Sequence, residues 1–364
     1  MRLLLVTALT ASIVFADTLP AQAAGPHQVV TVGTAAAPRG ERAYGTIAVP
    51  MGSDAGTTIR VAVVNGVKEG PVVAFISGAH GTEYTSIVAL TRLIERIDPK
   101  GLAGTVIIVP LLNVASFEQM VPHINPVDKK GMNAGYPGDA GGTQTARVLA
   151  LIADQVVKPA DVVVDLHGGD LDEDLRPYSY WIRGGNLRKD ADSRALALAF
   201  GLDMIIVRDV DVSNPASARS LSGYAMSLGK TTVVAEAGHS GIVNKVETDA
   251  LVNGSLNVLA SLKMTVRPTI PAPRVTWVGS DQRVRADSGG MFYPTAKRGS
   301  RIAKGESVGW ITDYVGRKVS DVPSPQSGVV TFIRGVPSLS NGATIVTVAQ
   351  VYGASPPAYV KPAP

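Results

Sequence analysis

The chain has 364 residues, a formal net charge of +4 and no cysteine. Its apolar fraction of 45% and charged fraction of 18% are typical of a globular α/β protein with a full core, and they suit such a protein better than a disordered or coiled-coil chain. Without cysteine there is no disulfide, no thiol nucleophile and no thiolate zinc site. The small positive charge is not gathered into a Lys/Arg run, so no nucleic-acid partner is indicated.

The N-terminus has the layout of a secretory signal peptide. Arg2 precedes the apolar run "LLLVTALTASIVF", and Ala21-Gln22-Ala23 supplies the small residues of a cleavage site. The apolar run is too short to span a bilayer comfortably. We therefore predict a signal peptide over residues 1–24, export most simply to a bacterial periplasm, and no membrane anchor after cleavage.

From about residue 70, apolar strand-like runs alternate with helix-like stretches. Continuous Val/Ile runs predict strands that are covered on both faces, in 71–78, 104–113, 160–169, 203–210 and 230–238. Apolar residues at helical spacing predict helices in 84–97, 143–157, 190–201, 216–229 and 244–264. This alternation predicts an α/β fold with a mostly parallel or mixed sheet.

The rest of the chain has a different pattern. The proline-rich stretch 266–275 predicts a linker, and residues 276–352 have the short apolar runs and Gly/Ser-Pro turns of a small all-β domain. We expect the catalytic domain over 67–265. The lead-in segment 25–66 and a disordered tail over 353–364 complete the predicted organisation.

Polar side chains stand where three of the predicted strands end. His80 and Glu83 follow the first strand, His167 ends the third, and Glu236 lies near the end of the fifth. In open α/β sheets, ligands gather at the carboxyl ends of strands. His80, Glu83 and His167 are two imidazoles and a carboxylate, the ligand set of hydrolytic zinc sites, and Glu236 could move protons of the attacking water. Asp165, on the same strand face as His167, could orient that ring.

Each of these residues alone has a structural explanation. His80 and Glu83 could form an ion pair or cap at a helix start, and His167 could be a hydrogen-bonded core histidine. Glu236 could cap a strand end. All stand at strand ends with glycines nearby, and this shared placement favours the metal site. The spacing of His123 and His239 does not favour either as a site residue.

The motifs Gly78-x-His80-Gly81-x-Glu83, Asp165-Leu166-His167 and Glu236-Ala237-Gly238, in this order, resemble those of the succinylglutamate desuccinylase/aspartoacylase family, within the zinc carboxypeptidase superfamily. The segment "INPVDKKGMNAGYPG" (124–138) is similar to a family segment that lies between the first two motifs. The all-β stretch 276–352 resembles the lipoyl-like barrel that follows the family's catalytic domain.

The resemblance implies a carboxypeptidase-like α/β/α sandwich with a mixed sheet. It implies one Zn²⁺ per chain, bound by His80, Glu83 and His167, with Glu236 as general base and then acid. Asn133 and Tyr136 would contact the substrate. The implied reaction is hydrolysis of an amide bond in a small acylated substrate.

The chain departs from the family at two arginines. Ala134 stands where the family has an arginine after the motif asparagine, and the position of a second arginine falls at about Pro122. These guanidiniums would clamp the substrate carboxylate and steady the oxyanion, so their loss argues against a substrate held by its α-carboxylate. Arginines from other elements could reach the site instead, and the candidates are Arg147, Arg176 and Arg183.

The functional hypothesis is an exported zinc-dependent amidohydrolase or deacylase. One alternative is a periplasmic metallocarboxypeptidase acting on peptides or cell-wall fragments, which would need an open groove. The other is a catalytically silent metal-binding protein, which would have no need of a proton-moving Glu236.

Overall fold

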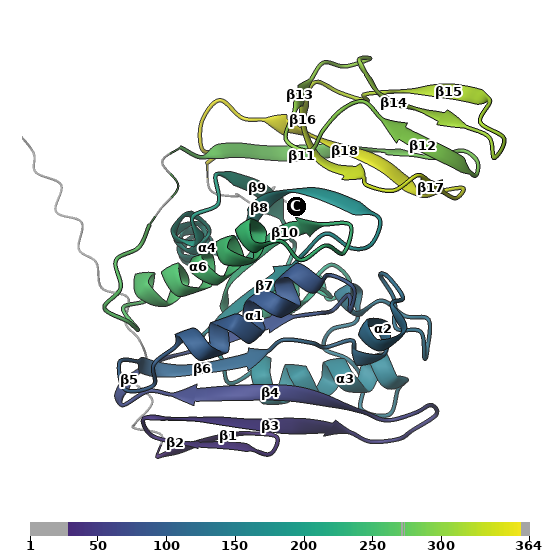
Figure 1. Cartoon of the computed structure of the whole chain (residues 1–364). Coiled ribbons are helices and arrows are strands. Elements are labelled where there is room, and N and C mark those ends of the chain that lie inside the picture. Colours follow the sequence, from purple (N-terminus) through teal and green to yellow (C-terminus); the bar gives the residue numbers. More distant parts are fainter. Residues whose placement is uncertain (1–27, 271, 273, 358–364) are drawn as a thin grey trace, which may run out of the picture.

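The computed structural model describes residues 28–270, 272 and 274–357. The predicted signal peptide and most of the predicted tail lie outside these residues. The central element is a twelve-stranded sheet (Figure 1). Its strand order is β13 (Arg301–Ile302), β16 (Gly328–Arg334), β18 (Thr344–Val351), β11 (Thr276–Arg285), β9 (Met204–Asp209), β8 (Glu173–Arg183), β10 (Thr231–His239), β7 (Val162–His167), β5 (Lys68–Ser77), β6 (Ala103–Val109), β4 (Thr57–Asn65) and β3 (Glu41–Val49).

Two smaller sheets accompany it. One pairs β1 (Val29–Val32) with β2 (Ala35–Pro38), and the other has the order β15 (Lys318–Pro323), β14 (Ser307–Thr312), β12 (Gly290–Pro294) and β17 (Ser338–Leu339). The helices are α1 (Tyr84–Arg96), α2 (Val114–Gln119), α3 (Gln144–Ile152), α4 (Leu187–Phe200), α5 (Leu221–Ser227) and α6 (Lys245–Ser261). A 3-10 turn covers Met132–Ala134, and a π-helical turn over Ala153–Val157 extends α3.

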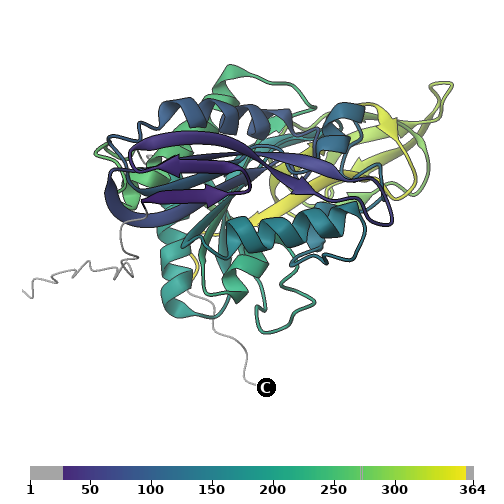
Figure 2. The same ribbon diagram turned by 90° about the horizontal axis from the view of Figure 1, so that it is seen from below.

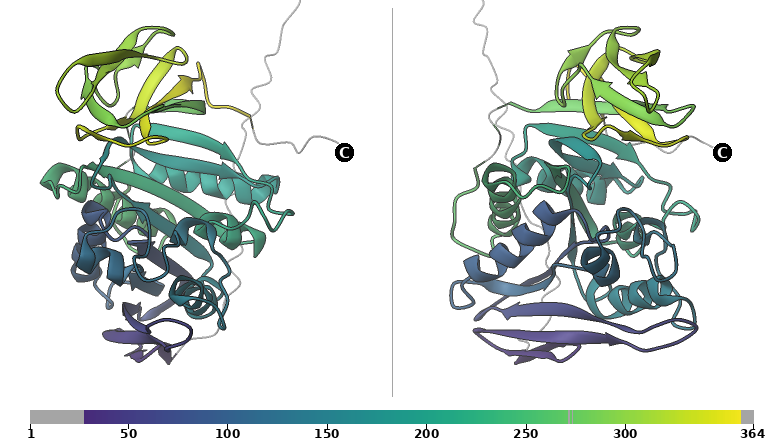
Figure 3. Two further views of the ribbon diagram at one scale, coloured as in Figure 1. Left: turned by 90° about the vertical axis from the view of Figure 1, so that its right-hand side faces the viewer. Right: turned by 45° about the vertical axis from the view of Figure 1, so that its right-hand side comes forward.

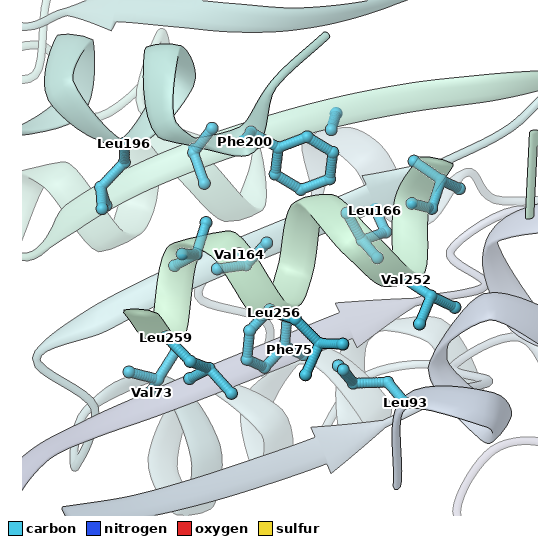
Figure 4. Close-up of a cluster of buried hydrophobic side chains, with 14 of the residues drawn as sticks. Val73, Phe75, Leu93, Val164, Leu166, Leu196, Phe200, Val252, Leu256 and Leu259 are labelled. Carbon is cyan, nitrogen blue, oxygen red and sulfur yellow. The ribbon is translucent and has the colours of Figure 1, made fainter. Parts of the chain in front are cut away.

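Helices cover both faces of the central strands, as the continuous Val/Ile runs predict (Figure 2). Successive residues of a strand point to opposite faces. Val73 and Phe75 of β5 therefore pack with α1, α4 and α6, whereas Ala74 and Ile76 pack with α3 and α5. Figure 4 shows the first of these cores, where Phe75 lies among leucine and valine side chains of the helices. The mixed α/β architecture is confirmed.

The register of three parallel strands brings the predicted site residues together at the carboxyl ends of those strands. β7 lies between β5 and β10 and is parallel to both. Ser77 is opposite Leu166, and His167 is opposite Glu236. The turn after β5, the end of β7 and the end of β10 therefore meet, as expected for parallel strand ends.

The structure differs from the predicted elements in several places. β8 is absent from the prediction because Pro177 and four charged residues interrupt its apolar pattern. α2 is also absent from the prediction, and α5 is shorter than its predicted range. Residues expected as a lead-in form β3 and β4, which extend the central sheet through the pairing of β4 with β6.

Residues 276–351 are all β, as predicted (Figure 3). Their strands β11, β18, β16 and β13 continue the twelve-stranded sheet beyond β9, and β12, β14, β15 and β17 form the separate four-stranded sheet. β11 pairs with β9 at its start and with β18 along its length, so one strand connects the two parts. β16 also pairs with the first residues of β8. The described helices include none long and apolar enough to cross a membrane.

Gly81 fixes the packing of the turn after β5. A Cβ at this position would lie 2.3 Å from the backbone nitrogen of Phe117 and 2.6 Å from the carbonyl oxygen of Asn113. We expect Gly81→Ala to lower the free energy of unfolding by about 1–3 kcal/mol, because backbone atoms must move to admit the methyl group. Denaturant unfolding measures this. Gly353→Ala is the control, since no atom lies within 4 Å of its Cβ position, and an equal loss in both variants would contradict the packing argument.

Candidate active site

His80, Glu83 and His167 converge at the carboxyl ends of the central parallel strands. The Nδ1 atom of His80 lies 2.5 Å from one carboxylate oxygen of Glu83, and Nδ1 of His167 lies 3.0 Å from the other. The backbone nitrogen of Gly168 donates a further hydrogen bond to Glu83. One potential ligand atom from each of the three side chains lies within 4.8 Å of the others. Two nitrogen donors and one oxygen donor at this spacing fit a zinc ion.

Two acidic residues stand beside this cluster. Oδ1 of Asp165 lies 3.2 Å from Nε2 of His167, on the side of the ring that faces away from Glu83. Glu236 lies opposite His167 in the sheet, and the hydroxyl of Tyr178 donates to its Oε2 atom over 2.8 Å. Asp165 therefore fixes the His167 ring, and Tyr178 fixes the Glu236 carboxylate.

The charges of these groups are strongly coupled. Burial raises the pKa of Glu83, but the imidazoles of His167 and His80 outweigh it, and the net pKa lies well below the usual value. Burial lowers the pKa of His167, yet Asp165 and Glu83 hold it above the usual value. Burial raises the pKa of Glu236. Glu83 is thus the anionic centre of the cluster.

A cavity of about 820 Å³ opens onto this cluster. His80, Glu83, His167, Asp165 and Glu236 all line it. Its wall continues over β8 and β9, and residues of β11, β16 and β18 close it from the all-β region. These last residues include Asp281, Arg283, Thr331, Phe332, Thr344 and Thr347.

The two residues predicted to contact substrate have different placements. Asn133 lines the cavity. Tyr136 is buried and stacks on Tyr224 with ring centroids 5.8 Å apart, and it is not part of the lining. Its hydroxyl has no hydrogen-bond partner among the described residues.

Of the three arginines suggested as replacements, only Arg183 lines the cavity, and it is paired with Asp209. Arg147 is buried against Asp54, and Arg176 pairs with Asp203. His239 is paired with Glu247 and does not line the cavity.

His123 lies beside the cluster although its position in the sequence does not suggest it. Its ring centroid is 5.6 Å from that of His80, and its nitrogens contact Asp170 at 3.1 Å and Asp172 at 3.0 Å. Asp170 also accepts a hydrogen bond from Thr82, which ties the loop of His123 to the turn that carries His80. The only signal in the sequence is that His123 directly follows the position assigned to the second family arginine.

Glu173 and Tyr178 are two further site residues that the sequence reasoning missed. Both belong to β8, and Glu173 lines the cavity near Glu83 and Glu236. Burial, with the charge of Glu83, raises the pKa of Glu173 to about 8. Tyr178, Tyr180 and Ile182 alternate along β8 and line the cavity, so a search for period-two alternation across Pro177 would have found them.

Comparison with known proteins identifies the family. The succinylglutamate desuccinylase/aspartoacylase catalytic domain matches residues 69–262. The chain therefore belongs to the succinylglutamate desuccinylase/aspartoacylase family, which is a family of amide deacylases. It is 27% identical over 301 residues to the N-alpha-acetyl-L-2,4-diaminobutyric acid deacetylase of Halomonas elongata, covering 78% of this chain and 83% of that protein.

Solved structures have the same fold. A succinylglutamate desuccinylase/aspartoacylase of Rhodobacter sphaeroides superposes with a TM-score of 0.76 at 24% identity, over 86% of this chain and 96% of the other. The product-bound ectoine utilization protein EutE (DoeB) of Ruegeria pomeroyi gives a TM-score of 0.78 at 21% identity, over 85% and 95%. The coverage extends well beyond the matched catalytic domain, so the similarity in fold includes part of the all-β region.

The hydrogen bond to Asp172, together with the charge of Asp170, overcomes burial and raises the pKa of His123 to about 9. The charged ring therefore stabilises the fold below its ordinary pKa of 6.5, and this contribution is lost as the pH rises through about 9. We expect NMR titration of the metal-free protein to place the His123 midpoint well above 6.5, and Asp172→Asn to lower it. Asp321→Asn, an exposed carboxylate paired with Lys318, is the control. A wild-type midpoint near 6.5 would contradict the assignment.

Proposed function

We propose that the protein is an exported zinc-dependent amidohydrolase that removes an acyl group from a small N-acylated amino acid. The observation that carries this proposal is the convergence of His80, Glu83 and His167 on one cavity, with Glu236 in register on the neighbouring strand. Membership of a family of amide deacylases supports the reaction type.

The charge of the site supports a bound cation. Four carboxyl groups line the cavity beside the imidazoles of His80 and His167, and they belong to Glu83, Asp165, Glu173 and Glu236. In the metal-free protein, burial and the charge of Glu83 raise the pKa of Glu173 and of Glu236, so both groups retain protons more readily than free carboxyl groups do. A bound cation would offset the negative charge that this crowding opposes. His80, His167 and Glu83 would hold a zinc ion, which when bound would act as a Lewis acid toward a carbonyl oxygen and would lower the pKa of a water so that it can attack at neutral pH.

The remaining residues have roles that follow from their contacts. Asp165 holds the His167 ring so that Nδ1 is directed at Glu83. Glu236 accepts a proton from the attacking water at a carboxylate oxygen and later delivers it to the departing amine nitrogen. Tyr178 holds the Glu236 carboxylate during this exchange.

The shape of the cavity favours a small substrate over a peptide. Side chains of β11, β16 and β18 close one side of it, so a long chain would meet the all-β region. The Halomonas elongata relative is named as a deacetylase of an N-acetylated diamino acid, a substrate of the size that we propose. Whether residues 276–352 fold as a separate lipoyl-like barrel stays a prediction.

The first test concerns the metal. We expect purified wild-type protein to contain about one zinc per chain, and His80→Ala and His167→Ala to lose it, because each removes one of three protein ligands. Inductively coupled plasma mass spectrometry measures the metal. His239→Ala is the matched control, a histidine paired with a carboxylate outside the cavity, and it should retain zinc. Full zinc in either His80→Ala or His167→Ala would make the ligand assignment wrong.

The same preparations separate catalysis from metal binding. Glu236→Gln should retain zinc and lose hydrolysis of N-acetyl amino acids by about 10²- to 10⁴-fold, the usual contribution of a general base. The panel should include N-acetyl-L-2,4-diaminobutyrate and short peptides. Zinc without turnover of any compound in the wild type would favour the silent metal-binding protein, and turnover of peptides alone would favour the carboxypeptidase.

Export rests on the N-terminal sequence alone. If the apolar run after Arg2 directs secretion, the exported protein begins within residues 20–28, near Ala24. Intact-mass measurement of protein recovered from the periplasm of an expressing bacterium tests this. A start outside that window, or recovery of the full-length chain, would contradict the cleavage site.

A further inference from the structure

Arg219 lies in space beside the position where the family's arginine is missing. Its Nε atom donates to the carbonyl oxygen of Ala134 over 2.9 Å. In the reverse direction, the backbone nitrogen of Tyr136 donates to the carbonyl oxygen of Arg219 over 3.0 Å. These two bonds join the segment between β9 and α5 to the Asn133 turn, although the segments are 85 residues apart. Arg219, Asn133 and Ala134 line the same cavity as His80.

The segment that carries Arg219 has a defined conformation. The hydroxyl of Ser217 donates to the carbonyl oxygens of Asp211 and Asn214, and the amide of Ala216 donates to the side chain of Asn214. Internal bonds of this kind hold the segment in one shape over the cavity. The backbone of Arg219 is therefore held in place, and its guanidinium is held by the hydrogen bond to Ala134.

The charge of Arg219 has no counter-ion in the described part of the chain. Four arginines of that part line the cavity: Arg183, Arg208, Arg219 and Arg283. Arg183 is paired with Asp209 at 2.6 Å, and Arg283 approaches Asp281 at 3.5 Å. No described carboxylate pairs with either of the other two arginines. Because Nε of Arg219 bonds a neutral carbonyl, its charge is retained and its two terminal nitrogens stay available.

Arg208 fits the same role less well. Its guanidinium lies over the Tyr180 ring, 5.4 Å from the centroid. Its positive charge also acts to lower the pKa of Glu236. Arg208 is therefore already engaged by the Tyr180 ring and by the Glu236 carboxyl group, which leaves it less available to a substrate carboxylate than Arg219.

We propose that Arg219 binds the carboxylate of the N-acylated amino acid and so sets the specificity of the enzyme. Arg219, from the segment between β9 and α5, brings a guanidinium to the backbone of Ala134, the residue at which the motif that the sequence resembles has an arginine. A planar guanidinium with two free terminal nitrogens suits a carboxylate, which accepts two parallel hydrogen bonds. This inference rests on the proposed function and names the group of the substrate that the cavity recognises.

The test compares two probes that differ only in charge, N-acetyl-L-2,4-diaminobutyrate and its carboxamide. Binding is measured by calorimetry on zinc-loaded Glu236→Gln protein, so that hydrolysis does not interfere. The parent should prefer the carboxylate. Adding Arg219→Ala should weaken carboxylate binding by about 10- to 100-fold, the loss expected for a charged hydrogen-bond pair, and leave carboxamide binding unchanged.

Two further variants distinguish recognition from general damage. Arg219→Lys keeps the positive charge without the two parallel N–H donors of a guanidinium, so it should recover part of the preference for the carboxylate probe. A purely structural role of Arg219 would instead weaken the binding of both probes equally. Arg317→Ala removes one positive charge at a side chain that is 82% exposed and should change neither affinity.

Loss of the preference in Arg208→Ala but not in Arg219→Ala overturns the proposal, as does a parent that binds both probes equally. Failure of the proposed function has a different signature. In that case the wild type hydrolyses neither probe, while the preference for the carboxylate and its dependence on Arg219 persist in the binding measurement.

Discussion

The buried carboxylate of Glu83 is the interaction on which the rest of the site depends. Its oxygens contact the Nδ1 atoms of His80 and His167 and accept a hydrogen bond from the backbone amide of Gly168. These contacts join the turn after β5 to the end of β7. An isolated buried carboxylate would be costly, and here two imidazoles and an amide compensate it. The parallel register of β5, β7 and β10 then places Glu236 beside the same group.

Much of this arrangement could be predicted from the sequence because it is local. Strands with continuous apolar runs can be recognised in the sequence. A polar residue at the end of such a run lies at the carboxyl end of a strand, where ligands bind in open α/β sheets. The residues His80, Glu83, His167 and Glu236 all follow this rule, and the structure brings them together. Asp165 follows from the alternation of side chains along β7.

What could not be predicted depends on contacts between distant segments. β8 combines Pro177 with charged residues, so its pattern does not resemble the buried strands, yet it contributes Glu173 and Tyr178 to the site. His123 lies beside His80, and its ring contacts Asp170 and Asp172 from a distant segment. Tyr136 has a motif position that suggests substrate contact, but stacking on Tyr224 keeps it in the core.

The two absent arginines illustrate the same limit. A motif position that lacks its arginine shows which segment has lost a charge. It does not show which other segments pack beside that position in the folded protein. Arg219 is 85 residues from Ala134 and binds its carbonyl oxygen, so the cavity keeps a guanidinium at that place. His123, which directly follows Pro122, likewise puts a cationic ring beside His80. If Arg219 binds the substrate carboxylate as we propose, the alanine at position 134 no longer argues against a substrate held by its α-carboxylate, because a cavity recognises charge by position in space and not by position in the chain.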